Sequence, residues 1–367
     1  MKIINVVGAR PNYMKIAPLI EAMRKRRGIS QFLVHTGQHY DNVMSRLFFD
    51  DLGLPEPDMF LGVGSGSHAE QTGKIMMMFE KILLKENPDL VLVVGDVNST
   101  VACSLAAAKL GISVAHVEAG LRSFDRSMPE EINRTVTDHL SDYLFTTEES
   151  ANRNLIREGI PKERIFFVGD VMADTLLKNR KKAGKSRILD RLGLSEKEYA
   201  VLTVHRPATV DIRRRFECLI EVLARISERI RIVFPVHPRT GKMMEEFDLG
   251  DKLRGMDNII VTEPLGYLDF LRLMDCSKFV LTDSGGIQGE AAVLGIPCLS
   301  LRESTEKYVT IEEGTNVLVG TDKKRIIEET TRILDGKWKN GSIPPLWDGH
   351  AAERIVDVLA SRIVAKK

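Results

Sequence analysis

The sequence has little of what marks secreted, membrane-bound or nucleic-acid-binding proteins. Its 367 residues include only four cysteines, and no pair of them has the spacing of a metal or redox motif: Cys103, Cys218, Cys276 and Cys298. The first residues, MKIINVVGAR, hold too short an apolar run for a signal peptide, and no run approaches the length of a transmembrane helix. The net charge of +1 gives no electrostatic reason to expect binding to nucleic acid or a membrane surface. We therefore expect a cytoplasmic protein with reduced thiols.

Standard cofactor and metal motifs are also missing. Neither G-x-G-x-x-G nor G-x-x-x-x-G-K-[ST] follows a predicted strand, so the usual dinucleotide and ATP fingerprints are absent. His35 and His39 lie close together in the sequence, but they lack carboxylate neighbours and are weak support for a metal site. The sequence predicts neither a metal ion nor a cofactor.

The residues that are present have the composition and pattern of a two-domain α/β protein. Hydrophobic residues make up 43% and charged residues 28% of the chain, and its length suits two ordinary domains. Short apolar runs alternate with helical patterns, which is typical of parallel, doubly wound sheets. We predict strands at residues 2–7, 32–35, 90–94, 112–115, 143–146 and 165–168, and then at 200–204, 231–235, 259–261, 279–282 and 298–301. A Lys- and Arg-rich stretch at 174–194 separates the two sets, so the predicted domains are 1–172 and 173–350.

Two carboxylates follow consecutive predicted strands. Asp96 ends the segment LVLVVGD and Glu118 ends ISVAHVE. If these strands pair in parallel, their carboxyl ends lie about 4.8 Å apart. The two carboxylates would then share one crevice and could transfer protons as general acid and base. The alternatives are that Asp96 caps the following helix and that Glu118 pairs with Arg122.

A third carboxylate, Glu130, has a strong structural alternative. The stretch Ser127-Met128-Pro129-Glu130 fits a capping box, in which the glutamate reaches back to the serine backbone. Proline near the start of a helix fits the same interpretation. From spacing alone we favour the cap over catalysis. Arg134 lies one turn further on and could pair with Glu130 or Glu131.

Two glycine-containing turns could hold phosphate. In the first, residues 8–15 (GARPNYMK), Arg10 and Lys15 could point at a phosphate, or they could be solvated charges. In the second, residues 279–290 (FVLTDSGGIQGE), a strand is followed by Ser284, Gly285 and Gly286 and then by a helix, whose amino end can bind an anion. Glu290 lies about one turn into that helix and could accept hydrogen bonds from ribose hydroxyls. The alternative is a tight turn followed by an exposed glutamate.

Further polar and aromatic residues follow strands of the second half. His205 and His237 each come at the end of a predicted strand, which indicates a polar wall along a cleft. Tyr267 and Phe270 could face a nucleotide base, although aromatic side chains more often pack in the core. Two α/β halves that face each other would leave a cleft between their strand ends for an extended ligand such as a nucleotide sugar.

These segments together resemble one family, the non-hydrolysing UDP-N-acetylglucosamine 2-epimerases. The matching pieces run in order along nearly the whole chain: GARPNYMKIAPLI, HTGQHYD, GSGSHAEQTGK, VVGDVNST, HVEAGLRSFDRSMPEEINR, HRP, PVHPRT, EPLGYLDF, LTDSGGIQGE and IPPLWDGHAAERIV. The resemblance implies a glycosyltransferase-B-like fold of two Rossmann-like domains with an interdomain cleft. It also implies a homodimer. In our domain division, the C-terminal helix 351–367 packs back on the first domain. The family interconverts UDP-GlcNAc and UDP-ManNAc without a nicotinamide cofactor.

The resemblance also assigns roles to residues of this sequence. The implied acid–base and active-site residues are Asp96, Glu118, Glu130 and His205. The implied substrate contacts are Arg10, Lys15, Arg134, Phe270, Ser284, Gly285, Gly286, Glu290 and Lys307. On family grounds alone, Glu130 therefore changes from a helix cap to a catalytic residue. The implied reaction eliminates UDP to leave a 2-acetamidoglucal and adds UDP back after C2 has been reprotonated on its other face.

Three positions depart from the family pattern. Lys307 stands where arginine is common and lacks the planar fork of a guanidinium. Gly289 stands where glutamate is usual, and Thr209 where asparagine is usual. These departures bear on the choice of UDP-sugar and on allosteric control by UDP-GlcNAc. Competing interpretations are an epimerase of UDP-diacetamido-glucuronic acid, a glycosyltransferase of the same fold and a non-catalytic nucleotide-sugar sensor.

Overall fold

The computed structural model describes residues 1–38 and 51–365, without the side chains of Arg10 and residues 362–365. The helix expected around residues 42–52 and the histidine at position 39 lie largely outside these residues. The chain forms two compact units, Met1–Lys178 with Pro345–Lys367, and Asn179–Pro344. The predicted boundary after residue 172 falls in helix α7 (Val171–Ala183), and the structure divides the chain six residues later within that helix.

The first unit is built on a seven-stranded sheet in the order β3-β2-β1-β4-β5-β6-β7. All of its strand pairs are parallel. The strands are β1 (Lys2–Val7), β2 (Ser30–His35), β3 (Met59–Phe60), β4 (Leu90–Val94), β5 (Ser113–Ala119), β6 (Tyr143–Thr146) and β7 (Ile165–Phe167). All five residues of β4 are buried, as expected for a central strand that helices cover on both faces. Successive strands after β1 are added on one side of the β1–β4 pair, and those after β4 on the other side.

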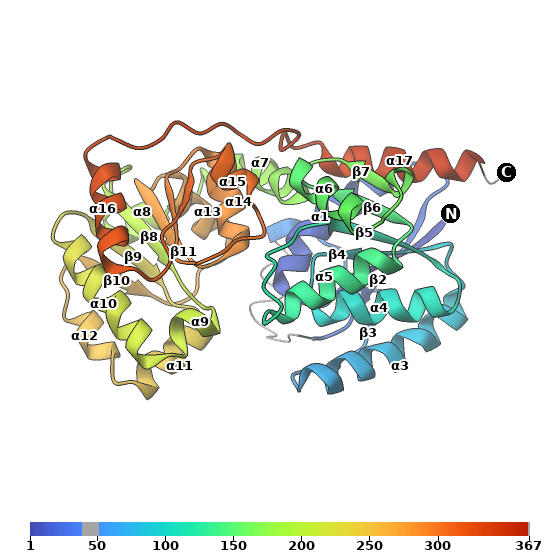
Figure 1. Cartoon of the computed structure of the whole chain (residues 1–367), viewed down its shortest axis with the longest axis horizontal. Coiled ribbons are helices and arrows are strands. Elements are labelled where there is room, and N and C mark those ends of the chain that lie inside the picture. Colours follow the sequence, from blue (N-terminus) through green and yellow to red (C-terminus); the bar gives the residue numbers. More distant parts are fainter. Residues whose placement is uncertain (39–50, 366–367) are drawn as a thin grey trace. The chain divides into compact units, whose positions relative to one another are not determined.

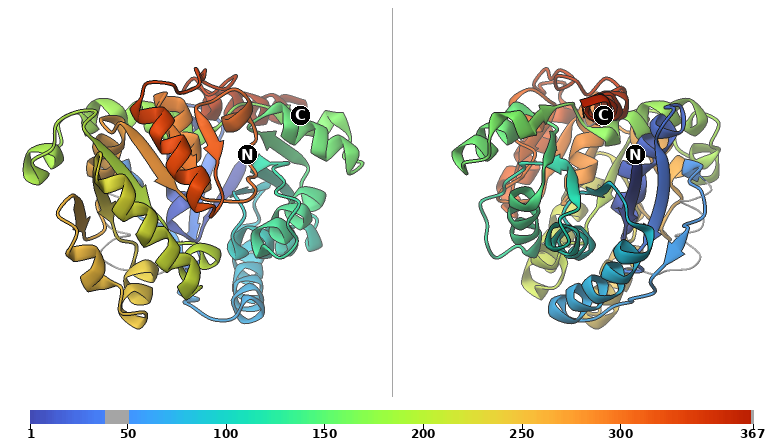
Figure 2. Two further views of the ribbon diagram at one scale, coloured as in Figure 1. Left: turned by 60° about the vertical axis from the view of Figure 1, so that its left-hand side comes forward. Right: turned by 90° about the vertical axis from the view of Figure 1, so that its right-hand side faces the viewer.

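Helices cover both faces of this sheet. They are α1 (Arg10–Arg24), α3 (His68–Glu86), α4 (Asn98–Lys109), α5 (Pro129–Leu140), α6 (Glu149–Arg157), α7 and α17 (Ala351–Ala365), with a 3₁₀ turn at Lys162–Arg164. Helix α4 packs against both α3 and α5, and α1 packs against α17 (Figure 1). Strand β1 near the start of the chain and helix α17 near its end both belong to this unit (Figure 2).

Specific contacts tie the C-terminal helix to the rest of the first unit. The Asp174 carboxylate of α7 accepts hydrogen bonds from the first amides of α17, those of Ala351 (3.1 Å) and Ala352 (2.7 Å). Trp347 is 1% exposed, and its indole donates to the Thr147 carbonyl at 2.8 Å. These bonds satisfy the free amides at the helix start and the buried indole.

The second unit has a six-stranded sheet in the order β10-β9-β8-β11-β12-β13. Its strand pairs are also all parallel. The strands are β8 (Tyr199–Thr203), β9 (Arg231–Pro235), β10 (Ile259–Thr262), β11 (Phe279–Thr282), β12 (Cys298–Ser300) and β13 (Asn316–Leu318). The helices are α8 (Ile188–Leu192), α9 (Pro207–Val210), α10 (Arg213–Ser227), α11 (Pro238–Glu246), α12 (Gly250–Arg254), α13 (Tyr267–Asp275), α14 (Gly285–Leu294), α15 (Val309–Glu312) and α16 (Lys323–Leu334).

The predicted alternation of strands and helices is confirmed, with corrections at short elements. Strand β3 has two residues and β13 three, too few for their pattern to stand out in the sequence. Helix α14 begins at Gly285, two residues before its predicted start at Ile287. The two glycines therefore form the first turn of the helix and do not precede it.

Candidate active site

The first group of candidate residues lies where the chain direction changes in the sheet of the first unit. Open α/β sheets bind ligands outside the carboxyl ends of their strands at such a point. Strands β4 and β5 pair in parallel with Val94 opposite Val117, so Asp96 and Glu118 follow neighbouring strand ends. The predicted convergence of these two segments is therefore found. Glu118 has φ +75° at a register shift of β5, a strained conformation that costs about 1–3 kcal/mol and is typical of functional sites.

Glu118 is held by Lys15 of α1. The lysine Nζ lies 2.8 Å from Glu118 Oε1, and both side chains are 7% exposed. A Cβ at Gly95 would come within 2.8 Å of the same Nζ, so this glycine leaves room for the ammonium group. The alternative partner of Glu118 was wrong, because Arg122 pairs with Asp138 and Glu158 instead. The resemblance assigned Lys15 to a phosphate or sugar contact. In the structure its ammonium group forms an ion pair with the Glu118 carboxylate.

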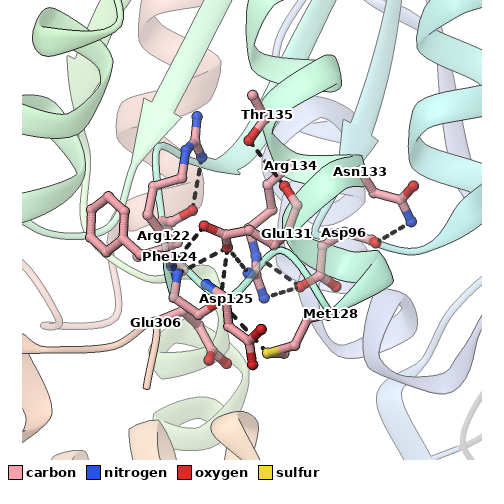
Figure 3. A network of polar contacts seen from close by, with 12 residues as sticks. Asp96, Arg122, Phe124, Asp125, Met128, Glu131, Asn133, Arg134, Thr135 and Glu306 are labelled. Atoms are coloured by element: carbon pink, nitrogen blue, oxygen red, sulfur yellow. Dashed lines mark hydrogen bonds and ion pairs between the residues drawn. The ribbon is translucent and has the colours of Figure 1, made fainter. Parts of the chain in front are cut away.

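Asp96 is held by Arg134 of α5 (Figure 3). The guanidinium donates to Asp96 Oδ2 from Nε at 3.1 Å and from Nη2 at 2.7 Å, and its Nη1 donates to Glu131 at 2.7 Å. Asp96 does not cap α4, whose N-cap is Val97 without a side-chain bond, so that alternative was wrong. Arg134 does pair with Glu131, as one alternative predicted. It also binds Asp96, the aspartate that the resemblance makes catalytic.

The capping-box interpretation of Glu130 was also wrong. The backbone and hydroxyl of Ser127 donate to Asp125 at 2.9 and 2.6 Å, and α5 has no side-chain cap. Glu130 is exposed and lies four residues before Arg134, so both point to the same side of α5. No hydrogen bond of the Glu130 carboxylate is formed within the described part of the chain.

The neighbouring Glu131 also holds a loop, a structural role that the sequence interpretation missed. It is 5% exposed and accepts from the Ser123 amide (2.9 Å) and hydroxyl (3.0 Å) and from the Phe124 amide (2.9 Å), as Figure 3 shows in part. It thereby fixes the loop between β5 and α5. Its spacing of three residues from Arg134 was the available signal.

In the second unit, His205 follows β8 at the corresponding change of direction between β8 and β11. Asp283, which is fully buried, accepts from the His205 amide at 3.0 Å and the Arg206 amide at 2.9 Å. His205 Nδ1 also lies 3.3 Å from the same carboxylate. The rings of His205 and His237 have centroids 5.1 Å apart, so the two predicted strand-end histidines do lie together. Asp283, the last residue before the glycine turn, was not recognised as the anchor of this loop.

The first turn of α14 contains Gly285 and Gly286, and Ser284 is its N-cap. A Cβ at Gly285 would overlap the carboxylate of Glu306, so a larger residue there would displace this carboxylate. Glu306 is 7% exposed and pairs with Arg302 at 2.7 Å, and the adjacent Lys307 is 3% exposed. Arg302 and Glu306 had not been predicted as part of this region.

Glu290 lies further along α14 and is buried, so the alternative of an exposed glutamate was wrong. Tyr267 of α13 faces it: burial and the hydrogen-bonded Glu290 carboxylate raise the pKa of the Tyr267 hydroxyl well above its usual value. Phe270, on the next turn of α13, is half-buried. Tyr267 is therefore a core residue that holds Glu290, and Phe270 retains an accessible face.

The described residues contain no group of His, Cys, Asp or Glu side chains that could hold a metal ion. No helix in this part of the chain is both long and apolar enough to cross a membrane. Arg10 is the first residue of α1, but its side chain lies outside the described residues.

The two α/β units match known enzymes that act on nucleotide sugars. The family model for UDP-N-acetylglucosamine 2-epimerase matches residues 21–360. A UDP-N-acetylglucosamine 2-epimerase of Methanocaldococcus jannaschii is 46% identical over 98% of this chain and 99% of its own. The crystal structure of the M. jannaschii enzyme in complex with UDP-GlcNAc and UDP matches with a TM-score of 0.91 at 46% identity, over 98% of this chain and 100% of that one. A UDP-2,3-diacetamido-2,3-dideoxy-D-glucuronate 2-epimerase of Pseudomonas aeruginosa is 41% identical over 98% of this chain and 99% of its own.

The chain belongs to the UDP-N-acetylglucosamine 2-epimerase family. The predicted resemblance, the α/β fold of two Rossmann-like domains and the isomerase class are thereby confirmed.

Proposed function

We propose that this chain interconverts UDP-GlcNAc and UDP-ManNAc by eliminating UDP and adding it back. The observation that carries the proposal is the pair of carboxylates, Asp96 and Glu118, at neighbouring strand ends of one sheet. Each is held by a largely buried cation, Arg134 or Lys15. Membership of the family and the UDP-GlcNAc in the M. jannaschii complex support this choice of substrate.

The proposed reaction has two half-steps that mirror each other. A carboxylate removes the proton from C2 while the C1–O bond breaks, and UDP leaves with the electron pair of that bond. The resulting 2-acetamidoglucal is then protonated at C2 from the opposite face, and UDP adds back at C1. Proton transfer on both faces needs carboxylates on two sides of the sugar, and we assign it to Asp96, Glu118 and Glu130, assisted by His205.

The second unit is proposed to hold the UDP group. The first turn of α14, Ser284 to Gly286, offers backbone amides and the positive end of the helix to the diphosphate. These groups would stabilise the charge that develops on UDP as it leaves. The remaining proposed contacts are Arg10 and Lys307 with phosphate, Glu290 with ribose and Phe270 with uracil. We assign Lys15 mainly to its ion pair with Glu118, and secondarily to a contact with the substrate.

The test is to offer UDP-GlcNAc alone in deuterated water and follow the sugar by NMR. Epimerisation through elimination must replace the C2 proton by deuterium in both epimers. A glycosyltransferase would show no exchange without an acceptor, and a hydrolysing epimerase would release free ManNAc and UDP. A sensor would leave the sugar unchanged. Formation of UDP-ManNAc with C2 still fully protonated would refute the carboxylate mechanism.

A second candidate substrate is UDP-2,3-diacetamido-2,3-dideoxy-D-glucuronate. It is favoured by the 41% identity to the P. aeruginosa enzyme that carries this name. Both sugars have the UDP group and the 2-acetamido carbon on which the proposed residues act, so the same carboxylates would serve either. Comparing kcat/KM for the two sugars under identical conditions decides between them.

We also propose that the chain forms a homodimer through helices α3 and α5. Met77 and Leu84 on α3 are 61% and 68% exposed, and they lie seven residues apart on one face of the helix. Ile132 and Val136 on α5 are 49% and 38% exposed. Both helices flank α4, and exposed apolar groups of this size are typical of subunit interfaces. Light scattering should give twice the chain mass, and Leu84→Glu should reduce it to one chain, while Lys162→Glu, an exposed charge reversal outside α3 and α5, should not.

The proposed location is the cytoplasm. All four cysteines are free, and three of them are buried, which suits a reducing compartment. Cell fractionation with an antibody to the native chain tests this location directly.

A further inference from the structure

A fully buried histidine, His116, lies next to the proposed catalytic carboxylates without being one of the proposed acids or bases. It belongs to β5 and precedes Glu118 by two residues. Its Nε2 lies 2.8 Å from the carbonyl oxygen of Gly95, the residue before Asp96. Its Nδ1 lies 2.6 Å from Asp138 Oδ1 on α5. One ring therefore connects the end of β4, strand β5 and helix α5.

Both partners of this ring are hydrogen-bond acceptors. The Gly95 carbonyl can only accept, and so can an ionised carboxylate. Burial alone would raise the pKa of Asp138, but His116 and Arg122 outweigh it and lower the pKa below the usual value. A neutral imidazole has a single N–H donor, whereas two acceptors require two. A ring that donates from both nitrogens would satisfy the Gly95 carbonyl and the Asp138 carboxylate together.

The carboxylate of Asp138 is itself tied to the backbone beyond Glu118. Its Oδ2 accepts from the Gly120 amide at 3.1 Å and lies 2.7 Å from Arg122 Nη2. Arg122 in turn makes two bonds to Glu158, the residue that follows α6, at 2.8 and 2.7 Å. Positive and negative groups thus alternate along the network, which spares each of them an unpaired charge in the interior.

We propose that His116 is a positioning residue: as a buried imidazolium it fixes Gly95 directly and Gly120 through Asp138, and so sets the spacing of Asp96 and Glu118. This inference rests on the proposed role of those two carboxylates. A ring with only one donor would leave one of its two partners unsatisfied, and that strand end would shift. A displacement of about 1 Å at reacting groups can cost about 100-fold in rate.

The other charged groups near β5 are engaged elsewhere. Lys15 of α1 pairs with Glu118, and Arg134 of α5 pairs with Asp96 and Glu131. Within residues 1–38 and 51–365, no titratable side chain other than Asp138 hydrogen bonds to the ring of His116. Asp138 is therefore the group whose charge decides the protonation of the ring.

The first test reads the protonation of His116 directly and does not depend on activity. In the intact protein labelled with ¹⁵N-histidine, one histidine should show both ring nitrogens protonated under the conditions of the activity assay. That signal should disappear in His116→Asn, and in Asp138→Asn it should change to that of a neutral ring, because the amide keeps the shape of the carboxylate without its charge. A wild-type protein in which no histidine has both ring nitrogens protonated under those conditions would overturn the proposal, whether or not either variant folds.

The second test separates positioning from a general structural role. His116→Asn should lower kcat for epimerisation about 100-fold while KM and the affinity for UDP stay near wild type. His139→Asn is the matched control, because that ring is exposed on α5 and bonds only the Thr135 carbonyl at 2.8 Å. A folded His116→Asn protein with wild-type kcat, or one that loses UDP affinity and kcat in proportion, contradicts the inference. If the proposed function fails, the wild type will not epimerise, yet the imidazolium signal will still be present.

Discussion

Replacing Lys15 by methionine should destabilise the first unit and stop turnover, because it leaves a carboxylate buried without its counter-ion. Lys15 Nζ and Glu118 Oε1 are 2.8 Å apart, and each side chain is only 7% exposed. The second oxygen of Glu118 is buried and has no hydrogen-bond partner among the described residues. The ammonium group is therefore the main compensation for the buried negative charge.

The size of the effect follows from the geometry. At 2.8 Å and an effective dielectric constant of about 20, two unit charges attract each other by about 6 kcal/mol. Part of this attraction only offsets the cost of removing both ions from water, and breaking such a pair from one side costs about 3–5 kcal/mol. We expect a loss of this size for Lys15→Met. The double variant Lys15→Met/Glu118→Gln should recover part of it, because no charge remains buried.

Urea unfolding can measure this loss in one unit at a time. The chain has two units and need not unfold in a single step, so the probe must be local. Trp347 is buried in the first unit, and the one other tryptophan, Trp338, can be replaced by phenylalanine in every variant. A loss below about 1 kcal/mol in Lys15→Met, or a double variant whose loss equals the sum of the two single ones, would refute the reasoning.

Three further predictions follow from other contacts. Glu130→Gln should lower kcat about 100-fold without loss of stability, since Glu130 is exposed and caps nothing; a stability loss with normal turnover in thermal and kinetic assays would contradict this. Gly285→Ala should weaken UDP binding at least about tenfold by calorimetry, because a methyl group there displaces Glu306, whereas Gly73→Ala, with open space around it, should not. Burial raises the pKa of Asp174 to about 6, above its unfolded value, so its contribution to stability should fall by about 3 kcal/mol as pH rises from 4 to 6. Between pH 4 and pH 6 the melting temperature of Asp174→Asn should therefore rise relative to that of the wild type. A difference between the two melting temperatures that does not change with pH would contradict the raised pKa of Asp174.

The fold could be predicted because buried parallel strands leave a direct trace in the sequence. A central strand covered on both faces must be apolar throughout, and Leu90–Val94 was predicted and found with the same bounds. Some missed elements, such as β3 and α9, are two to four residues long, and the nine-residue helices α6 and α11 were missed as well. Their existence depends on pairing and packing with distant segments, which local pattern does not contain.

The site could be predicted only as far as the strand ends. Asp96 and Glu118 converge because parallel pairing brings consecutive strand ends together, and that pairing follows from the strand–helix alternation. Their partners Lys15 and Arg134 could not be assigned, because the reach of a long side chain depends on how its helix packs on the sheet. The capping box failed for a related reason: Ser127 bonds to Asp125, a local competitor two residues away.

The net charge of +1 conceals how the charges of the first unit are placed. Four basic side chains that are almost fully buried gather around the ends of β4 and β5 in that unit: Lys15, His116, Arg122 and Arg134. They are matched there by buried acids, including Glu118, Glu131 and Asp138. Well-packed apolar residues in such places are often as stable or more stable, so stability alone does not account for so many buried ions. Each ion pair does fix one carboxylate or one loop relative to its neighbours, which is what proton transfer to and from a single carbon atom requires.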